Sequence, residues 1–386
     1  MSGGYHEGYP DPEDAPPHTR IGRRSGLALT LVAVLVLAGA ALSWIPVDKV
    51  VFRPGPVFNT LGTIDGTQVI SVEDDLPTYP TGGELYFTTV VLDGGPGSKV
   101  TAWEWLTARF DPALSVYPRK DVFPEDVTAQ EVREQNTELM QHSQDDAAVV
   151  GLRAAGIPVP EEVVVAQVIA DAPADGVLHV DDQILSVEGE STTDTETVRE
   201  LLQDVEPGES AAMTVLREGE KVDLDVPTKL DEQTGRTIVG VYLAPRYQMP
   251  YTVTIDAGNV GGPSAGLMFS LAVYDTITEG ELTGGRSIAG TGTISGLGTV
   301  GPISGIHQKM YASERAGAEL FLAPVDNCDE VAGDEPGDLT VVPVATFEEA
   351  LGYVEDAASA DDLADLDLPT CEQAVEQDDE ATSTGD

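Results

Sequence analysis

The chain has 386 residues, which is enough for two or three domains with a sizeable buried core. It carries 20 Lys and Arg against 67 Asp and Glu, a net charge of -47, so its surface repels phosphate backbones and we exclude nucleic acid as a partner. Two cysteines, and five histidines without metal-ligand spacing, exclude a zinc ribbon and a disulfide-dense mini-fold, and we expect no metal.

The N-terminal part divides into a polar tail and an apolar run. Residues 1–25 are rich in Gly, Pro, Asp and His, a composition that predicts a disordered cytoplasmic tail. Residues 26–46 contain an uncharged apolar run that would extend about 28 Å as a helix, close to the thickness of the bilayer core. We therefore expect one transmembrane helix there.

The residues that flank this run predict its orientation. Arg20, Arg23 and Arg24 precede it and Trp44 lies near its end, a pattern that favours a cytoplasmic N-terminus. The chain would then be a single-pass protein of the cell membrane, with the residues beyond the helix outside the cell. The alternative is a cleaved signal peptide, because Ala38-Gly39-Ala40 is an A-x-A site behind a short apolar stretch.

Residues 50–150 are expected to form an extracellular, strand-rich segment followed by a helix, as part of the same module as residues 231–355. Alternating apolar residues from Glu84 to Val91 predict a strand, and Gly94-Gly95-Pro96-Gly97 predicts a turn. A helical pattern runs from about Ala129 to Ala155 and ends at Gly156.

Residues 156–228 show the pattern of a small β-rich domain. Strands are expected at Val163–Val168, Ile184–Val187 and Met213–Arg217, with a helix near Thr195–Leu202. The segment resembles a PDZ domain of the bacterial protease type. It differs in having Asp181-Asp182 where Gly-Asp is usual, and no Gly-Leu-Gly-Phe-like carboxylate-binding loop precedes Val163. A β module that positions its neighbour without binding peptide is therefore the alternative.

The first chemical motif lies in residues 231–355. An apolar strand from Tyr251 to Ile255 leads through a glycine-rich loop to Gly262-Pro263-Ser264-Ala265-Gly266, after which an apolar helix begins. Ser264 then sits at a helix N-terminus, where the backbone around Gly262, Pro263 and Ala265 could stabilise an oxyanion. The alternative is an ordinary serine N-cap.

A second motif decides between these alternatives. The segment from Thr291 to Lys309 contains Gly301-Pro302-Ile303-Ser304-Gly305 ahead of Lys309. Together the two motifs resemble the proteolytic domain of the Lon family, and the anchor and β-rich domain suggest its membrane-anchored, PDZ-containing members. The resemblance implies that Ser264 is the nucleophile, Lys309 its general base and Thr291 a supporting residue that orients the lysine amine.

The chemistry is consistent without the resemblance. A serine hydroxyl needs a base, and a lysine serves when burial lowers its pKa, which the apolar residues Ile303, Ile306 and Met310 favour. The alternative is an exposed surface lysine without a catalytic role. The chain has no G-x-x-x-x-G-K-[ST] motif, so we expect neither nucleotide nor any other cofactor.

These features predict an α+β protein that acts as an ATP-independent serine endopeptidase with a Ser-Lys dyad. Its partners would be exposed or flexible segments of extracytoplasmic proteins or peptides, and the resemblance implies a possible homo-oligomer. One alternative is a non-catalytic PDZ-type adaptor at the cell envelope. Another is an α/β-hydrolase esterase, because Gly262 to Gly266 fits G-x-S-x-G, but His307 follows Ser264 too closely for that fold.

Residues 356–386 form an acidic stretch without Lys or Arg and are expected to be a disordered tail. We predict a disulfide between Cys328 and Cys371, because these are the two cysteines and both belong to the part expected outside the reducing cytoplasm. The alternative is two unrelated free thiols.

Overall fold

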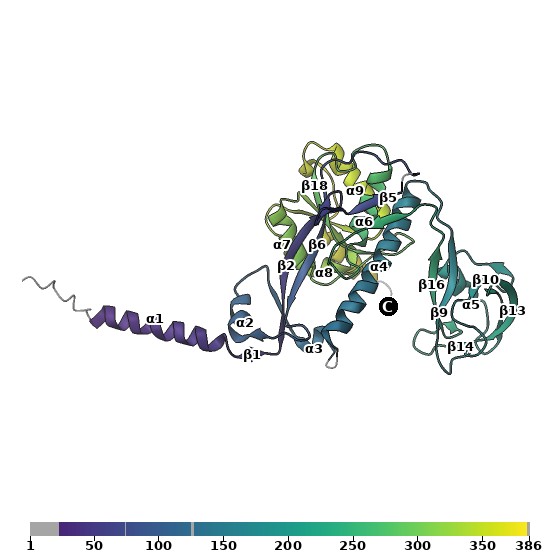
Figure 1. Cartoon of the computed structure of the whole chain (residues 1–386), viewed down its shortest axis with the longest axis horizontal. Helices are drawn as coiled ribbons and strands as arrows, with labels where there is room; N and C mark the ends of the chain where they lie inside the picture. Colours follow the sequence, from purple (N-terminus) through teal and green to yellow (C-terminus); the bar gives the residue numbers. More distant parts are fainter. Residues whose placement is uncertain (1–22, 74, 125–126, 384–386) are drawn as a thin grey trace, which may run out of the picture. The chain divides into compact units, whose positions relative to one another are not determined.

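The computed structural model describes residues 23–73, 75–124 and 127–383 (Figure 1). The predicted cytoplasmic tail therefore lies outside the described residues, apart from positions 23–25. By their contacts the described residues form two compact units. One unit takes the chain up to Arg53 together with Leu92–Val127, and the other takes Pro54–Val91 together with the chain from Thr128 onward.

The first unit contains short elements around a small core of Val51, Val100 and Ala108. The side chains of Thr101 and Glu104 form a capping box, which fixes the start of its second helix. Its elements after the N-terminal helix are β1 (Pro46–Val47), the antiparallel partner β7 (Val100–Thr101), α2 (Ala102–Ala108), β8 (Ser115–Pro118) and α3 (Arg119–Val122).

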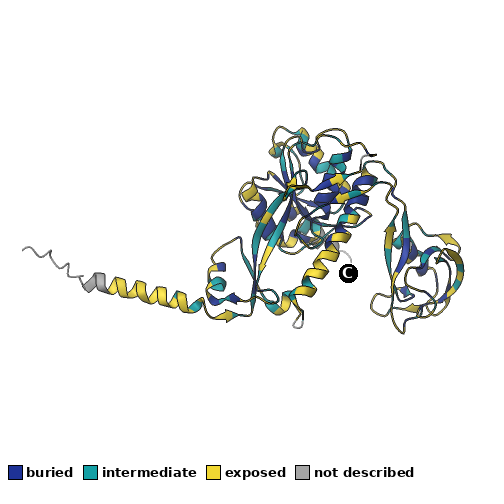
Figure 2. Ribbon diagram, viewed as in Figure 1, coloured by how far each residue is buried: buried dark blue, intermediate teal, exposed yellow. Residues whose placement is uncertain are grey.

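The apolar run that the sequence analysis assigned to a transmembrane helix forms α1 (Arg23–Leu42). Its described side chains are almost all exposed (Figure 2). The helix ends before residue 46 because the chain turns, with the Trp44 N–H donating to the Ala41 carbonyl oxygen. Among the described residues, no helix has both the length and the apolar character needed to cross a membrane. The expected transmembrane helix is therefore not supported by the structure.

A mixed sheet forms the centre of the second unit, with the strand order β22-β21-β18-β6-β2 and with β8 pairing antiparallel to the start of β2. Its strands are β2 (Lys49–Asn59), β6 (Glu84–Asp93), β18 (Ser287–Gly290), β21 (Leu320–Pro324) and β22 (Thr340–Val344). Because β6, β18, β21 and β22 pair in parallel, this region is mixed α/β, whereas the sequence analysis predicted α+β.

Successive residues of each strand point to opposite faces of this sheet. Apolar residues therefore lie on both faces, and helices pack against each. Ile288 and Leu322 belong to a core shared with α4 (Ala129–Ala154), α6 (Gly266–Ile277) and α9 (Phe347–Ser359). Ala289 and Phe321 belong to a second core, shared with α7 (Ile306–Ala316) and α8 (Cys328–Val331). The nucleophile candidate precedes α6 on one face, and the lysine lies on α7 of the other.

Three short strand pairs complete this part of the unit. They are β3 (Thr63–Ile64) with β4 (Thr67–Gln68), β5 (Ile70–Val72) with β17 (Val253–Ile255), and β19 (Thr293–Ile294) with β20 (Val300–Gly301). The last pair is a hairpin that lies, along the chain, between the two segments that carry Thr291 and Lys309.

A β-rich domain with its own core runs from Glu161 to Tyr247. Its sheet has the order β13-β12-β10-β9-β16, with β11 paired to β10. Its elements are β9 (Glu161–Val168), β10 (Gln183–Val187), β11 (Glu190–Ser191), α5 (Thr195–Gln203), β12 (Ser210–Arg217), β13 (Glu220–Pro227), β14 (Lys229–Leu230), β15 (Thr237–Ile238) and β16 (Val241–Tyr247). The domain extends beyond the predicted limit at residue 228 because β16 pairs with β9.

The C-terminal residues differ from the disordered tail expected over 356–386. α9 continues to Ser359, and it is followed by η3 (Leu363–Asp365) and α10 (Cys371–Ser383). Cys371 is buried in the core beside α7 and α8, and Ala374 and Val375 pack against that core. The spacing of these three residues gives α10 one apolar stripe. The sequence analysis did not recognise this stripe because the composition of the segment is acidic.

Candidate active site

Ser264 lies two residues before the start of α6, next to the N-cap residue Ala265, in a loop that α4 holds in place. The backbone N–H of Gly262 donates to the Asn136 carbonyl oxygen at 2.9 Å. The buried Ser143 hydroxyl donates to the Pro263 carbonyl oxygen, also at 2.9 Å. Two successive residues before the serine are therefore bonded to one helix, and the loop conformation does not depend on local turn chemistry alone.

The backbone of Ser264 is also bonded to the two residues that follow β18, which ends at Gly290. Its carbonyl oxygen accepts hydrogen bonds from the Gly292 N–H and from the Thr291 hydroxyl, both at 2.9 Å. Gly266 allows this close approach, since a Cβ atom there would lie 2.7 Å from both Ile294 Cγ2 and Ser143 Oγ. A side chain at position 266 would push the helix away from its neighbours.

Lys309 reaches this point from α7 on the opposite face of the sheet. Its Nζ lies 2.7 Å from Ser264 Oγ and 2.7 Å from Thr291 Oγ1. The residue is 2% exposed, and the adjacent Met310 is fully buried. The structure thus brings together the three side chains that the sequence analysis selected, although Ser264 lies in the loop before α6 and Lys309 lies on α7.

The electrostatics of the lysine suit a base. Burial lowers the pKa of Lys309 to about 7 from its ordinary value of 10.5. The Thr291 hydroxyl donates its proton to the Ser264 carbonyl, so toward Nζ it can only accept. A neutral amine therefore directs one N–H to Thr291 and keeps its lone pair for the Ser264 hydroxyl.

The predicted oxyanion residues differ in what they can donate. Pro263 has no N–H, and the Gly262 N–H is bonded to Asn136. At the start of α6, the N–H groups of Gly266 and Leu267 donate to the carbonyl oxygens of Pro263 and Gly292. The N–H groups of Gly262, Gly266 and Leu267 are therefore already bonded within the protein. Ala265 is the member of the predicted group that leads directly into the helix.

The two cysteines lie close to the helix that carries the lysine. The sulfur atoms of Cys328 and Cys371 are bonded to each other, closing a loop with a sequence separation of 43. Both residues belong to the core that contains Ile306 and Met310 of α7. Within the described residues, no group of three or more His, Cys, Asp and Glu side chains could hold a metal ion.

The β-rich domain contains a groove of about 320 Å³ between α5 and β16. Val198 and Leu202 line it from the helix, and Val241 and Leu243 line it from the strand. The segment Ile238-Val239-Gly240-Val241 leads into this strand, and Gly240 has a φ of +84°. The sequence analysis looked ahead of Val163 for a peptide-binding loop and did not single out this groove, because the strand that lines it comes last in the domain.

The other departure from the PDZ pattern has a structural explanation. Asp181 has a φ of +71°, a left-handed conformation in which glycine is usual. Asp182 is 1% exposed, and its Oδ2 accepts a 2.7 Å hydrogen bond from Arg217 Nη2. This ion pair connects β10 and β12, so the second aspartate serves the fold of the domain.

Comparison with known proteins supports both resemblances. Residues 126–228 match the family model of the PDZ domain, and residues 251–354 match that of the Lon protease (S16) C-terminal proteolytic domain. The first match includes α4, which packs on α6, and stops before β16. The crystal structure of the PDZ domain of an SdrC-like protein from Listeria monocytogenes has 22% identity and a TM-score of 0.20, covering 21% of this chain and 86% of that one.

Curated relatives are Lon proteases. The archaeal Lon protease of Archaeoglobus fulgidus is 32% identical over 133 residues, which is 34% of this chain and 20% of that protein. The Lon protease of Campylobacter concisus is 30% identical over 136 residues, which is 34% of this chain and 16% of that protein. The chain thus covers a fifth or less of the length of these relatives. It carries a PDZ domain and a domain homologous to the Lon proteolytic domain.

Proposed function

We propose that the protein is an ATP-independent serine endopeptidase in which Ser264 is the nucleophile and Lys309 the general base. The observation that carries the proposal is the 2.7 Å approach of a buried lysine amine to the serine hydroxyl at the start of a helix. Homology of residues 251–354 to the Lon proteolytic domain supports the same reaction. Thr291 completes the arrangement because its hydroxyl accepts from the lysine amine.

The reaction follows from this geometry. Ser264 Oγ attacks the carbonyl carbon of a peptide bond while its proton passes to the neutral Lys309 amine. The resulting ammonium then gives that proton to the leaving nitrogen as the peptide C–N bond breaks. Water then attacks the acyl-enzyme carbonyl while Lys309 again takes a proton, and the ammonium returns this proton to Ser264 Oγ as the ester C–O bond breaks. We assign the oxyanion contact to the Ala265 N–H, since Gly262 is bonded to Asn136 and Pro263 has no N–H.

The substrates we propose are exposed or flexible segments of extracytoplasmic proteins or peptides. The chain contains no phosphate-binding loop motif, so unfolding of a substrate would not be driven by nucleotide hydrolysis in this chain. The bonded pair Cys328–Cys371 supports a location outside the reducing cytoplasm, where such bonds persist.

Substitution of Ser264 and Lys309 tests the proposal against the adaptor alternative. We expect Ser264→Ala to lose at least about 10³-fold in kcat/KM on an unstructured peptide, because the two residues act as a unit. Lys309→Arg should be nearly as inactive as Lys309→Met, since arginine keeps its proton. Wild-type protein should react at Ser264 with an active-site serine probe such as a fluorophosphonate.

Circular dichroism and thermal unfolding of each variant provide the control for folding. A folded Ser264→Ala protein with full turnover would refute the assignment, and an unlabelled, inactive wild type would favour the adaptor. The esterase alternative has less support in the structure, because Lys309 contacts the Ser264 hydroxyl whereas the His307 ring nitrogen Nδ1 lies 3.4 Å from Asp334 Oδ2.

A further inference from the structure

The hairpin β19–β20 connects the two segments that hold the lysine in the candidate active site. It begins two positions after Thr291, and the chain leaves it through Pro302 toward α7 and Lys309. Any displacement of the hairpin therefore acts on both the hydroxyl that orients the amine and the helix that carries it. One flank of the hairpin is bonded to the chain before α9, where the Phe347 N–H donates to the Gly298 carbonyl oxygen at 2.8 Å.

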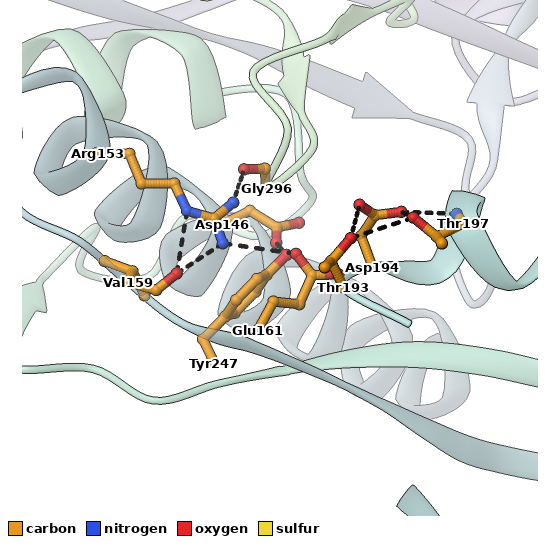
Figure 3. A network of polar contacts seen from close by, with 9 residues as sticks. All are labelled: Asp146, Arg153, Val159, Glu161, Thr193, Asp194, Thr197, Tyr247 and Gly296. Atoms are coloured by element: carbon orange, nitrogen blue, oxygen red, sulfur yellow. Dashed lines mark hydrogen bonds and ion pairs between the residues drawn. The ribbon is translucent and has the colours of Figure 1, made fainter. Parts of the chain in front are cut away.

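The other flank of the hairpin tip is held by Arg153 in the last turn of α4. Arg153 Nη1 donates to the Gly296 carbonyl oxygen at 2.8 Å (Figure 3). The Tyr247 hydroxyl lies against the same residue, since a Cβ atom on Gly296 would be 1.9 Å from that oxygen. Leu297, the next residue, is 60% exposed, so burial of its apolar side chain does not hold the tip on this flank. The tip is held there by the polar contacts at Gly296.

The same two side chains hold the places where the chain enters and leaves the PDZ domain. Arg153 Nη2 donates to the Val159 carbonyl oxygen at 2.8 Å and forms an ion pair with Glu161, the first residue of β9, at 3.5 Å. Tyr247, the last residue of β16, donates from its hydroxyl to Asp146 Oδ1 at 3.0 Å. The Arg153 guanidinium lies 5.6 Å from the centre of the Tyr247 ring, so the two side chains form one cluster.

α4 thus connects the junction to the catalytic loop as well. Ser143, which is bonded to Pro263, is followed at helical spacing by Asp146 and Arg153, so all three lie on one side of the helix. Because α4 is one rigid helix, it fixes the position of the serine loop relative to the hairpin tip. The contacts at its last turn depend on where the first and last strands of the PDZ domain lie.

We propose that Arg153 and Tyr247 are positioning residues for the peptidase reaction. They couple the junction strands of the PDZ domain to the hairpin β19–β20, and through it to Thr291 and Lys309. This inference rests on the proposed peptidase function. Neither residue touches the reacting atoms, so their loss should slow turnover more than it weakens substrate binding, and should change the pH dependence of turnover through the lysine.

The test compares Arg153→Met and Tyr247→Phe with the control Arg246→Met. Arg246 is the neighbour of Tyr247 on β16, is exposed, and pairs with the exposed Asp181. On an unstructured peptide we expect Arg153→Met to lower kcat about tenfold with less than a threefold change in KM, and to shift the midpoint of the pH profile. Tyr247→Phe, which removes a single oxygen atom, should have a smaller effect in the same direction, and Arg246→Met should behave as wild type.

Hydrogen exchange of the amides in residues 293–301 gives a readout that does not require activity. We expect faster exchange there in Arg153→Met, with unchanged protection in β10 and β12 of the PDZ domain. Wild-type exchange in the hairpin together with wild-type kcat in folded Arg153→Met and Tyr247→Phe would overturn the inference. An inactive wild type whose hairpin nevertheless loosens in Arg153→Met would refute the peptidase proposal and leave the coupling demonstrated.

Discussion

At the scale of single residues, the proposed mechanism makes Lys309 the group that sets the pH at which Ser264 can react. Burial lowers the pKa of its amine to about 7, and only the neutral amine can accept the serine proton. We therefore expect kcat/KM to rise about tenfold per pH unit below 7 and to become level above it. A profile on an unstructured peptide from pH 5 to 9 measures this directly, and a midpoint near the ordinary lysine value would contradict the assignment.

A second residue-scale prediction concerns Asp275 in the last turn of α6. Its carboxyl is 1% exposed, Oδ1 accepts from the Leu282 N–H at 3.0 Å, and Oδ2 has no hydrogen-bond partner within the described residues. Burial raises its pKa to about 6 from 3.8. The ionised group therefore destabilises the fold above pH 6, and this cost disappears as the pH falls through 6 toward 3.8.

Asp275→Asn removes the charge and keeps the oxygen that accepts from Leu282. We expect the variant to be more stable than wild type at pH 8 by about 1 to 3 kcal/mol, and the difference to vanish near pH 4. Urea unfolding at both pH values measures the free energies. A difference that is the same at pH 8 and pH 4 would show that the carboxylate charge is not its source.

At the scale of elements, the sequence was most informative where one element carries a periodic pattern. The helix expected from about Ala129 to Ala155 is α4, and the strand expected at Val163–Val168 is part of β9. Ser264 and Lys309 were selected because each stands in a distinctive local motif. Their contact was implied by a resemblance, since a residue in the loop before α6 and a residue of α7 are brought together only by the tertiary fold.

The contributions of α4 could not be predicted in the same way. Ser143 donates to Pro263 across 120 positions, and Arg153 donates to Gly296 across 143. Both acceptors are backbone carbonyl oxygens, which every residue has, so the residue type of the acceptor does not indicate the bond. The groove of the PDZ domain was missed for a topological reason. β16 follows β13 in the chain but pairs with β9, so the strand that lines the groove comes from the end of the domain and not from the part ahead of Val163.

At the scale of the whole molecule, the bond between Cys328 and Cys371 joins the C-terminal helix to the peptidase domain. α10 has no large apolar face of its own, and its contribution to the core is Cys371 with Ala374 and Val375. Next to the bond, the Asn327 side chain pairs with both backbone groups of Ile303, at 2.9 Å each, in the loop before α7. The bond therefore stabilises the loop before α7, the helix that carries Lys309.

Replacing both Cys328 and Cys371 by serine should reduce the free energy of unfolding by about 2 to 4 kcal/mol, since the chain-entropy model gives about 4 kcal/mol for such a loop. α10 should lose its protection from hydrogen exchange first, because the bond is what holds its small apolar stripe in place. Thiol titration of wild-type protein, denatured without reduction, should find no reactive thiol if the bond forms in the cell. Two reactive thiols would contradict the bond, and would remove the observation on which an extracytoplasmic location rests.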